Sequence, residues 1–115
     1  MTVYIYSYSG STILRMRSDG TVEDSHGSKI GRIRGGYIED AHGSTIGRIY
    51  SSSIETPKGS FYISGNSIVK SGSTIAYIKS GYIEKHGSTV AKFSGTSDKK
   101  LIAALVITFT QLIVR

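Results

Sequence analysis

Residues 98–115 read DKKLIAALVITFTQLIVR, and this stretch decides how the rest of the chain folds. From Leu101 to Val114 only two threonines and one glutamine are polar. Asp98 is of a residue type that caps helix N-termini, and the Leu-Ala-Ala that follows favours a helix. The valines, isoleucines and phenylalanine further on also have strand propensity. We predict one α-helix over residues 98–114.

The predicted helix is apolar around nearly its whole circumference, so it has to be enclosed by protein or by a membrane. Residues 101–114 span roughly 21 Å at about 1.5 Å per residue, whereas a bilayer core needs about 20 apolar residues. We therefore expect the rest of the chain to enclose the helix. The helix positions predicted to lie in the core are Leu101, Ile102, Leu105, Val106, Phe109, Leu112 and Ile113.

The rest of the chain is a repeat, which becomes visible when each copy is aligned on a Gly-Ser turn. The third copy reads YIEDAHGSTIGRI, with its turn glycine at Gly43. The six copies occupy residues 4–16, 21–33, 37–49, 53–63, 67–78 and 82–93. Their turn glycines are Gly10, Gly27, Gly43, Gly59, Gly72 and Gly87, at separations of 17, 16, 16, 13 and 15 residues.

Each copy has the signature of a β-hairpin, because short β-branched or aromatic stretches lie on both sides of the turn. Gly43 is expected to supply the positive φ that such a turn requires. A second small residue, Gly47, lies inside the returning strand and predicts a bulge or a close backbone contact. A bend there would turn Ile46 and Ile49 inward together, and in the alternative one of them packs between neighbouring hairpins.

A single hairpin is marginally stable in water, whereas repeated units stabilise one another by burying one continuous core. We therefore predict a single domain over residues 1–115 that is mainly β with one C-terminal helix. The repeats at residues 4–93 are expected to form a ring of antiparallel β-hairpins that encloses the apolar helix.

The unit IEDAHGSTIGRI, repeated and followed by DKKLIAAL before an apolar segment, resembles the β-flower families. These are small, mostly bacterial proteins, described as fourfold or fivefold, with the repeat pattern apolar-x-D-x-x-G-x-x-I-G-x-I. The resemblance covers nearly the whole chain and implies no catalytic activity, cofactor or ligand. The fourth copy departs from the pattern with Pro57 and no IGRI ending, and the fifth has Val69 and Lys70 in place of Glu-Asp. The YD repeats of large surface proteins match less well.

Composition and charge narrow the classes of function. The chain has no cysteine, which excludes disulfides and thiolate metal sites. Its formal charge is +6, with Lys and Arg dispersed among Asp and Glu, so we interpret them as a solvated surface. The first residues, MTVYIYSYSG, lack the features of a signal peptide, and a cytoplasmic location is expected.

Three histidines, His26, His42 and His86, directly precede the turn glycines of three copies. Clustered imidazoles bind zinc or nickel, which makes these residues the candidates for a metal site. The turns of a ring diverge, however, so we expect no metal and no cofactor.

Acidic residues recur just before the turns, and paired carboxylates are able to act as acid and base. Such catalysis needs unlike neighbours that separate the two pKa values, whereas a repeat supplies like neighbours. We expect each aspartate to start an Asx turn, and each glutamate to face water and pair with Arg32, Arg48 or Lys92 on a neighbouring strand. The residues concerned are Glu23, Asp24, Glu39, Asp40, Glu55 and Glu84.

Eight tyrosines interleave with Arg and Lys, an arrangement that stacks bases and contacts phosphate, although cross-strand packing is our preferred interpretation. They are Tyr4, Tyr6, Tyr8, Tyr37, Tyr50, Tyr62, Tyr77 and Tyr82. We predict a non-enzymatic structural or interaction module whose partner is a protein or a second copy of the chain. The alternatives are a protein that binds nucleic acid or another polyanion, and a membrane-associating protein that releases its C-terminal segment.

Overall fold

The computed structural model describes residues 2–114, which form twelve strands and one helix. The strands are β1 Val3–Ser7, β2 Thr12–Met16, β3 Thr21–Asp24, β4 Lys29–Arg34, β5 Tyr37–Asp40, β6 Thr45–Ile49, β7 Ser53–Thr56, β8 Gly59–Ser64, β9 Ser67–Lys70, β10 Ser73–Lys79, β11 Tyr82–Lys85 and β12 Ser88–Ser94. The helix is α1, Lys99–Phe109.

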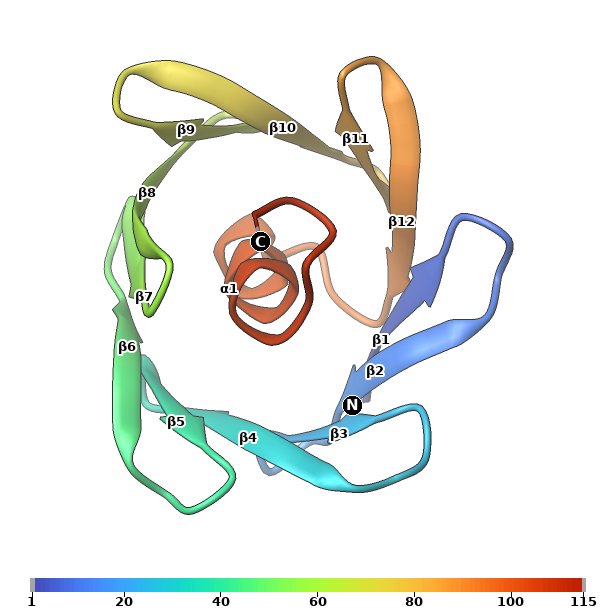
Figure 1. The fold of residues 1–115 in the computed structure, drawn as a ribbon, viewed down its shortest axis with the longest axis vertical. Coiled ribbons are helices and arrows are strands. Elements are labelled where there is room, and N and C mark those ends of the chain that lie inside the picture. The colour runs from blue at the N-terminus through green and yellow to red at the C-terminus, as the bar shows by residue number, and fades with distance from the viewer. Residues whose placement is uncertain (1, 115) are drawn as a thin grey trace.

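Every strand pairs antiparallel with the next one in sequence, and β1 pairs with β12, so the sheet closes into a barrel. The six predicted hairpins are β1–β2, β3–β4, β5–β6, β7–β8, β9–β10 and β11–β12. Figure 1 shows α1 at the centre of the ring and the hairpin loops pointing outward from it. The prediction of a mainly β ring that encloses a C-terminal helix is confirmed.

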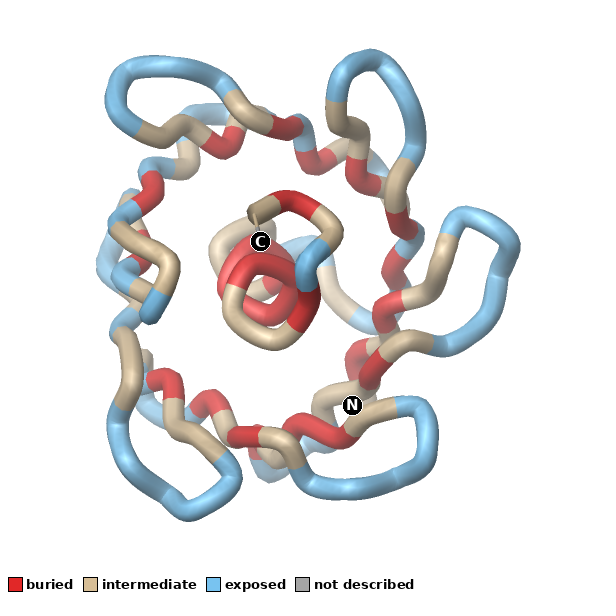
Figure 2. The backbone as a smooth tube through the Cα atoms, viewed as in Figure 1, coloured by how far each residue is buried: buried red, intermediate tan, exposed pale blue. Residues whose placement is uncertain are grey.

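The inner wall is built from three inward positions in each hairpin. The first strand supplies one fully buried aliphatic side chain: Ile5, Val22, Ile38, Ile54, Ile68 or Ile83. Its partners within the hairpin are, in the same order, Leu14, Gly31, Gly47, Phe61, Ala76 and Ala91. Its partners in the preceding hairpin are Phe93, Met16, Ile33, Ile49, Ile63 and Ile78. Figure 2 shows the resulting band of buried backbone facing α1, with exposed residues at the loops.

A bulge lies in the returning strand of five hairpins, immediately before the inward position of that strand. The residues skipped by the register are Ile13, Ile30, Ile46, Ile75 and Val90. Because of the extra residue, Ile46 and Ile49 both pack against the core, as the predicted bend requires. The β7–β8 hairpin keeps an unbroken register, and it belongs to the repeat copy that lacks the IGRI ending.

Glycine stands at two inward positions because other atoms come too close for a side chain. A Cβ on Gly31 would lie 2.4 Å from Cε1 of Phe109 in α1 and 2.6 Å from the carbonyl oxygen of Glu39. A Cβ on Gly47 would lie 2.3 Å from the carbonyl oxygen of Glu55. The predicted close backbone contact is therefore present, and at Gly31 it also brings the helix against the wall.

The hairpin turns come in two lengths, which contributes to the uneven spacing of the turn glycines. In the third copy Asp40 accepts hydrogen bonds from the N–H groups of His42 and Ser44, and Gly43 has the predicted positive φ of 86°. In the fifth copy lysine replaces the aspartate, and Ser71 and Gly72 both have positive φ. That pair forms a two-residue primed turn, which is one residue shorter.

The helix is shorter than predicted at its C-terminal end. Asp98 caps it as expected, accepting hydrogen bonds from the N–H groups of Lys100 and Leu101. The helix ends at Phe109, because Thr110 is extended and its hydroxyl donates to the carbonyl of Val106. Placing Leu112 and Ile113 in the helix was therefore wrong, although Ile113 is still buried.

The barrel encloses the middle of the helix completely, as the sequence predicts. All residues from Ile102 to Ile107 have no exposed surface. Leu101 and Phe109, at the two ends, are half-buried and pack against the core.

Lysines from the wall hold the segment that follows the C-terminal end of α1. Lys58 donates to the carbonyls of Thr110 and Val114, and Lys85 donates to the carbonyl of Ile113 at 2.6 Å. These carbonyls follow the negative end of the helix dipole, so ammonium groups are favourable there. Partial burial lowers the pKa of Lys58. The three hydrogen bonds tie the C-terminal segment to the fourth and sixth hairpins.

We predict that Gly31→Val lowers the melting temperature, because the new side chain overlaps the ring of Phe109 and a backbone carbonyl. Overpacking of this kind typically costs about 1–3 kcal/mol. Phe109→Leu in the same chain should recover part of the loss and leave the part due to the carbonyl. Lys29→Val, at an exposed position two residues earlier in β4, is the control. Strictly additive effects of Gly31→Val and Phe109→Leu in thermal unfolding would contradict this contact.

Candidate functional site

Four arginines gather on the outer surface of two hairpins, and we call this surface the arginine face. Arg15 lies in β2 and Arg17 directly follows it, while Arg32 and Arg34 lie in β4. In β2 and β4 these residues alternate with inward-facing neighbours such as Ile33, so the arginines point away from the core.

Strand register brings these arginines together although they are dispersed in the sequence. Arg15 lies opposite Glu23 of β3. The N–H of Arg17 donates to the carbonyl of Thr21, and Thr21 lies opposite Arg32. The fold thus brings together basic residues that are dispersed in the sequence, because β3 places β2 and β4 on either side of one row of outward residues.

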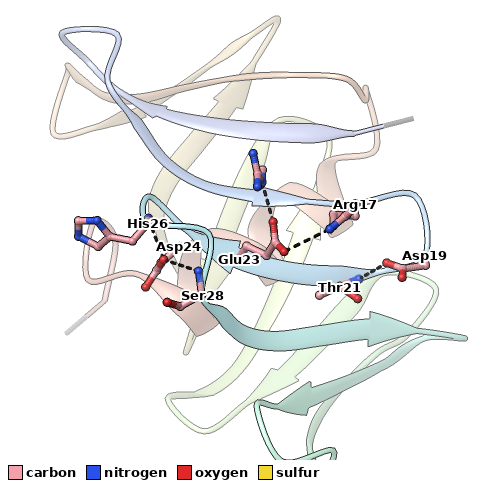
Figure 3. Close-up of polar contacts among 8 residues, drawn as sticks. Arg17, Asp19, Thr21, Glu23, Asp24, His26 and Ser28 are labelled. Atoms are coloured by element: carbon pink, nitrogen blue, oxygen red, sulfur yellow. Dashed lines mark hydrogen bonds and ion pairs between the residues drawn. The ribbon is translucent and has the colours of Figure 1, made fainter.

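Glu23 is the carboxylate that binds two side chains of the arginine face, Arg15 and Arg17. It is only 8% exposed, and its carboxylate accepts from Nε of Arg15 at 2.6 Å and from Nη1 of Arg17 at 3.5 Å (Figure 3). The hydrogen bond from Arg15 holds the pKa of Glu23 below its ordinary range, and the same bond raises the pKa of Arg15. Each guanidinium retains further N–H donors, and the two side chains are 42% and 60% exposed.

A shallow groove opens beside these guanidinium groups. Its volume is about 200 Å³, and Thr2, Tyr4, Arg15 and Arg17 line it. The ring of Tyr4 stacks on Tyr6 with centroids 5.9 Å apart and planes inclined by 16°. Guanidinium groups with free donors and a phenol at one edge suit an oxyanion such as a phosphate group.

A larger cleft of about 620 Å³ lies where the chain passes from the barrel into α1. Asn66, Lys79, Tyr82, Phe93 and Lys99 are among the residues that line it. Both of its ammonium groups already have acceptors, since Lys79 pairs with Glu84 at 2.9 Å and Lys99 donates to the side chain of Asn66. We therefore regard the arginine face as the stronger candidate.

The recurring glutamates lie opposite residues of the preceding hairpin, and only some of them have the cross-strand partners expected from the sequence. Glu23 is buried between Arg15 and Arg17, and Glu84 pairs with Lys79. The expectation that these carboxylates face water beside Arg32 or Lys92 was wrong. The bulge explains the difference, because it shifts the register within a hairpin while the register between hairpins stays continuous.

The remaining glutamates also lie opposite residues of the preceding hairpin. Glu39 lies opposite Arg32 of the preceding hairpin, and Glu55 lies opposite Arg48. Glu55 also accepts a hydrogen bond from the hydroxyl of Tyr50.

The aspartates at the turns behave as the sequence predicts. Asp24 accepts from the N–H groups of Ser28 and His26, which lowers its pKa (Figure 3). Asp40 does the same in the next hairpin. Asp19 lies in the turn between hairpins, and its pKa is lowered chiefly by the N–H of Thr21. These carboxylates stabilise turns in their ionised form.

The three histidines lie at the tips of different hairpins, and the structure does not bring them together. His26 is in the β3–β4 turn, His42 in the β5–β6 turn and His86 in the β11–β12 turn. Over residues 2–114 no group of three His, Cys, Asp or Glu side chains is placed to hold a metal ion.

Exposed tyrosines occupy a second outer surface, which we call the tyrosine face. It consists of Tyr37, Tyr50, Tyr62 and Tyr77, which are between 39% and 60% exposed, on the third to fifth hairpins. Arg48 lies between the rings of Tyr37 and Tyr50, 4.9 and 5.2 Å from their centroids. These tyrosines pack against side chains of neighbouring strands, and part of each ring stays exposed to solvent.

The sequence analysis missed the arginine face, although the repeat contained a signal for it. The first two copies carry arginine at two positions that are two residues apart, Arg15 with Arg17 and Arg32 with Arg34. The third copy has arginine only at the first of these positions, Arg48. In a strand, this spacing puts both arginines of a copy on one face.

The model of a protein family described as 5-fold beta-flower protein matches residues 2–62, just over half of the chain. No curated protein and no solved structure matches the chain. The matched segment includes β1 to β7 and therefore the whole arginine face. The family is described as fivefold, whereas residues 2–114 of this chain form six hairpins.

We predict that Glu23→Gln lowers the melting temperature by a few degrees at neutral pH, because the two arginines lose the charge that they share. The pKa of Glu23 is lowered in the folded state, so its stabilisation is fully present above its ordinary value of 4.5 and is lost as pH falls through the folded pKa. The difference between wild type and variant should therefore shrink below about pH 4. Thermal unfolding over this pH range is the measurement.

Glu39→Gln, at a half-buried position in β5, is the control for this variant. A difference between wild type and Glu23→Gln that stays constant into acid would show that the charge of Glu23 is unimportant.

Proposed function

The chain belongs to the 5-fold beta-flower family, and from this premise we propose that it is a non-enzymatic interaction module. On this proposal, the barrel is a rigid support, and the outer faces of its strands bind the partner. The observation that carries the proposal is the filling of the barrel by the chain itself.

Barrels that bind small ligands usually do so in an interior cavity. Here α1 occupies the interior, and its residues from Ile102 to Ile107 have no exposed surface. The inward positions of all six hairpins pack into the same core. A ligand inside the barrel would have to displace the helix on which that core depends, which favours a function on the outside.

The titratable groups favour a binding role over catalysis. General acid–base chemistry at neutral pH needs a group whose pKa is moved toward neutrality, usually by burial or by a like charge. Burial lowers the pKa of Lys58, but its ammonium group already donates to two backbone carbonyls of the C-terminal segment. Among the described residues, the carboxylates with shifted pKa values, Asp19, Glu23, Asp24 and Asp40, all have their pKa lowered by hydrogen bonds. Groups of this kind remain ionised and hold structure in place.

The outer faces have the composition of protein surfaces that bind partners. Tyrosine and arginine are enriched at interfaces because they supply large contact areas and several hydrogen-bond donors. On the tyrosine face, Arg48 is held between two rings, and Tyr50 is tied to Glu55. Side chains fixed in this way lose little conformational entropy on binding.

Enclosure of α1 argues for the interaction module over a membrane-associating protein. Release of the helix would expose Ile102 to Ile107 and would remove the centre of the barrel core. Over the described chain, α1 is too short to qualify as a membrane-spanning helix.

We predict that a photo-crosslinking amino acid placed at Tyr62 or Tyr37 in the cells that make the protein gives covalent adducts with a macromolecule. Both positions are exposed on the tyrosine face, so a partner bound there lies within reach. The same amino acid at Ala41, which is exposed in a hairpin turn, is the control. Adducts are expected from the strand positions and not from the turn. Absence of adducts from probes distributed over both outer faces would contradict an interaction module.

A further inference from the structure

We infer that the arginine face binds single-stranded nucleic acid, with its phosphates held by Arg15, Arg17, Arg32 and Arg34. This inference rests on the proposed interaction module and names the partner of one of its faces.

The two outer faces differ in charge. On the tyrosine face, Arg48 lies opposite Glu55, and Lys79 pairs with Glu84, so the charges balance. The four arginines of the arginine face stand against three carboxylates, Asp19, Glu23 and Glu39, which leaves a formal charge of +1. An anionic partner is therefore drawn to the arginine face and not to the tyrosine face.

Two of the four arginines are free of intramolecular ion pairs. Within residues 2–114, neither Arg32 nor Arg34 forms a salt bridge, and Nε of Arg32 is buried without a hydrogen-bond partner. Arg15 and Arg17 share the single carboxylate of Glu23 and keep further donors. The face therefore has unused hydrogen-bond donors in excess of its acceptors.

The guanidinium groups are spread along a track. Arg15 and Arg17 are two residues apart, which is about 6.6 Å along an extended backbone. Arg17 and Arg32 lie on either side of Thr21 of β3, which puts their backbones about 10 Å apart across the sheet. Charges at such intervals suit a polymer that carries a phosphate at each unit better than they suit one small anion.

Glu23 preorganises the groove that begins this track. Because the buried carboxylate fixes Arg15 and Arg17 beside Tyr4, the groove of about 200 Å³ exists before any ligand arrives. A phosphate that enters it meets two guanidinium groups whose orientation is already set, so binding costs little side-chain entropy. Glu23 acts as a positioning residue for the two arginines.

Aromatic rings beside the track favour a single strand over a duplex. Tyr4 and Tyr6 form a stacked pair on β1, and Lys92 of β12 lies opposite Tyr6. Unpaired bases stack on such rings, and lysine and arginine follow the phosphates between them. Reading a duplex through its major groove usually requires a protruding helix or ribbon, and α1, the one described helix, is enclosed in the barrel.

The test is fluorescence anisotropy with labelled oligothymidylate and oligouridylate of about 15 nucleotides, a length within the range bound by single barrel domains. We expect the affinity of the full chain to fall with salt, each phosphate contact contributing about −0.7 to the slope of log K against log salt. The double variant Arg17→Gln/Arg34→Gln should weaken binding by about tenfold or more and reduce the slope by about 1.4. Both positions are exposed, and the melting temperature of the variant verifies its fold.

The matched control is Lys99→Gln/Lys100→Gln, which removes the same charge from the start of α1 and should change the affinity less than about twofold. Equal losses in the two double variants would mean diffuse attraction to net charge and would overturn the inference. Absence of binding even at low salt would also overturn it.

Two competitors test the identity of the ligand. Oligoglutamate of equal charge that displaces the oligonucleotide equally well would assign the face to an acidic protein segment. Inorganic polyphosphate that competes equally well would show that the bases contribute nothing. Either result would overturn a nucleic-acid face. Neither would affect the crosslinking test, since adducts with proteins from the tyrosine face would still support an interaction module.

Discussion

The insertion of α1 into the barrel is the contact on which the other features depend. About eight strands close into a barrel that side chains alone are able to fill, and a larger number leaves a wider interior. This barrel has twelve strands, and its centre is filled by a helix with no exposed surface from Ile102 to Ile107. Hairpins are marginal by themselves, so closure of the ring and burial of the helix have to stabilise each other.

Residue sizes in the wall follow from the position of the helix. Where α1 brings Phe109 against the wall, the inward residue of β4 is Gly31. In the first and fourth hairpins the same position holds Leu14 and Phe61, which extend the wall inward. The hairpins therefore have similar strand pairing but inward side chains of different size. The sizes differ because six similar hairpins have to pack against one asymmetric helix. The departures from the repeat pattern are part of that fit.

The segment after the helix, residues 110–114, requires a second departure from the repeat pattern. Lys58 and Lys85, in the fourth and sixth hairpins, donate to carbonyls of residues 110–114. At the position of Lys85, the second and third copies carry aspartates that cap their own turns. The sixth hairpin, which holds the C-terminal segment through Lys85, thus has a cation in place of a turn-stabilising carboxylate, and a primed turn at His86 replaces the lost cap.

Local rules account for what the sequence predicted well. The turn at Gly43 and the cap at Asp98 each depend on residues within a few positions. The burial of residues 101–107 follows from their own apolar side chains. The partner of Glu23 depends instead on the register between two hairpins, which a bulge decides. The helix ends at Phe109 because Thr110 is extended, and both the N–H and the hydroxyl of Thr110 donate to the carbonyl of Val106; helix propensity does not predict this end.

The arginine face, like the partner of Glu23, depends on how the strands pair. Its residues are separated in sequence and meet only because β2 and β4 flank β3. Local patterns predict the elements, whereas pairing between elements builds the surface that we assign to the partner.

The most direct test of the central claim is the thermal unfolding of Leu105→Asp, followed by the strand signal in circular dichroism. Leu105 has no exposed surface, so a carboxylate there pays a large desolvation cost or holds a proton, and both destabilise the folded chain. Lys99→Asp, at the half-buried start of α1, is the matched substitution. We predict that Leu105→Asp loses the cooperative strand transition while Lys99→Asp keeps it. An intact strand transition in Leu105→Asp would show that the barrel stands without its helix and would contradict the account.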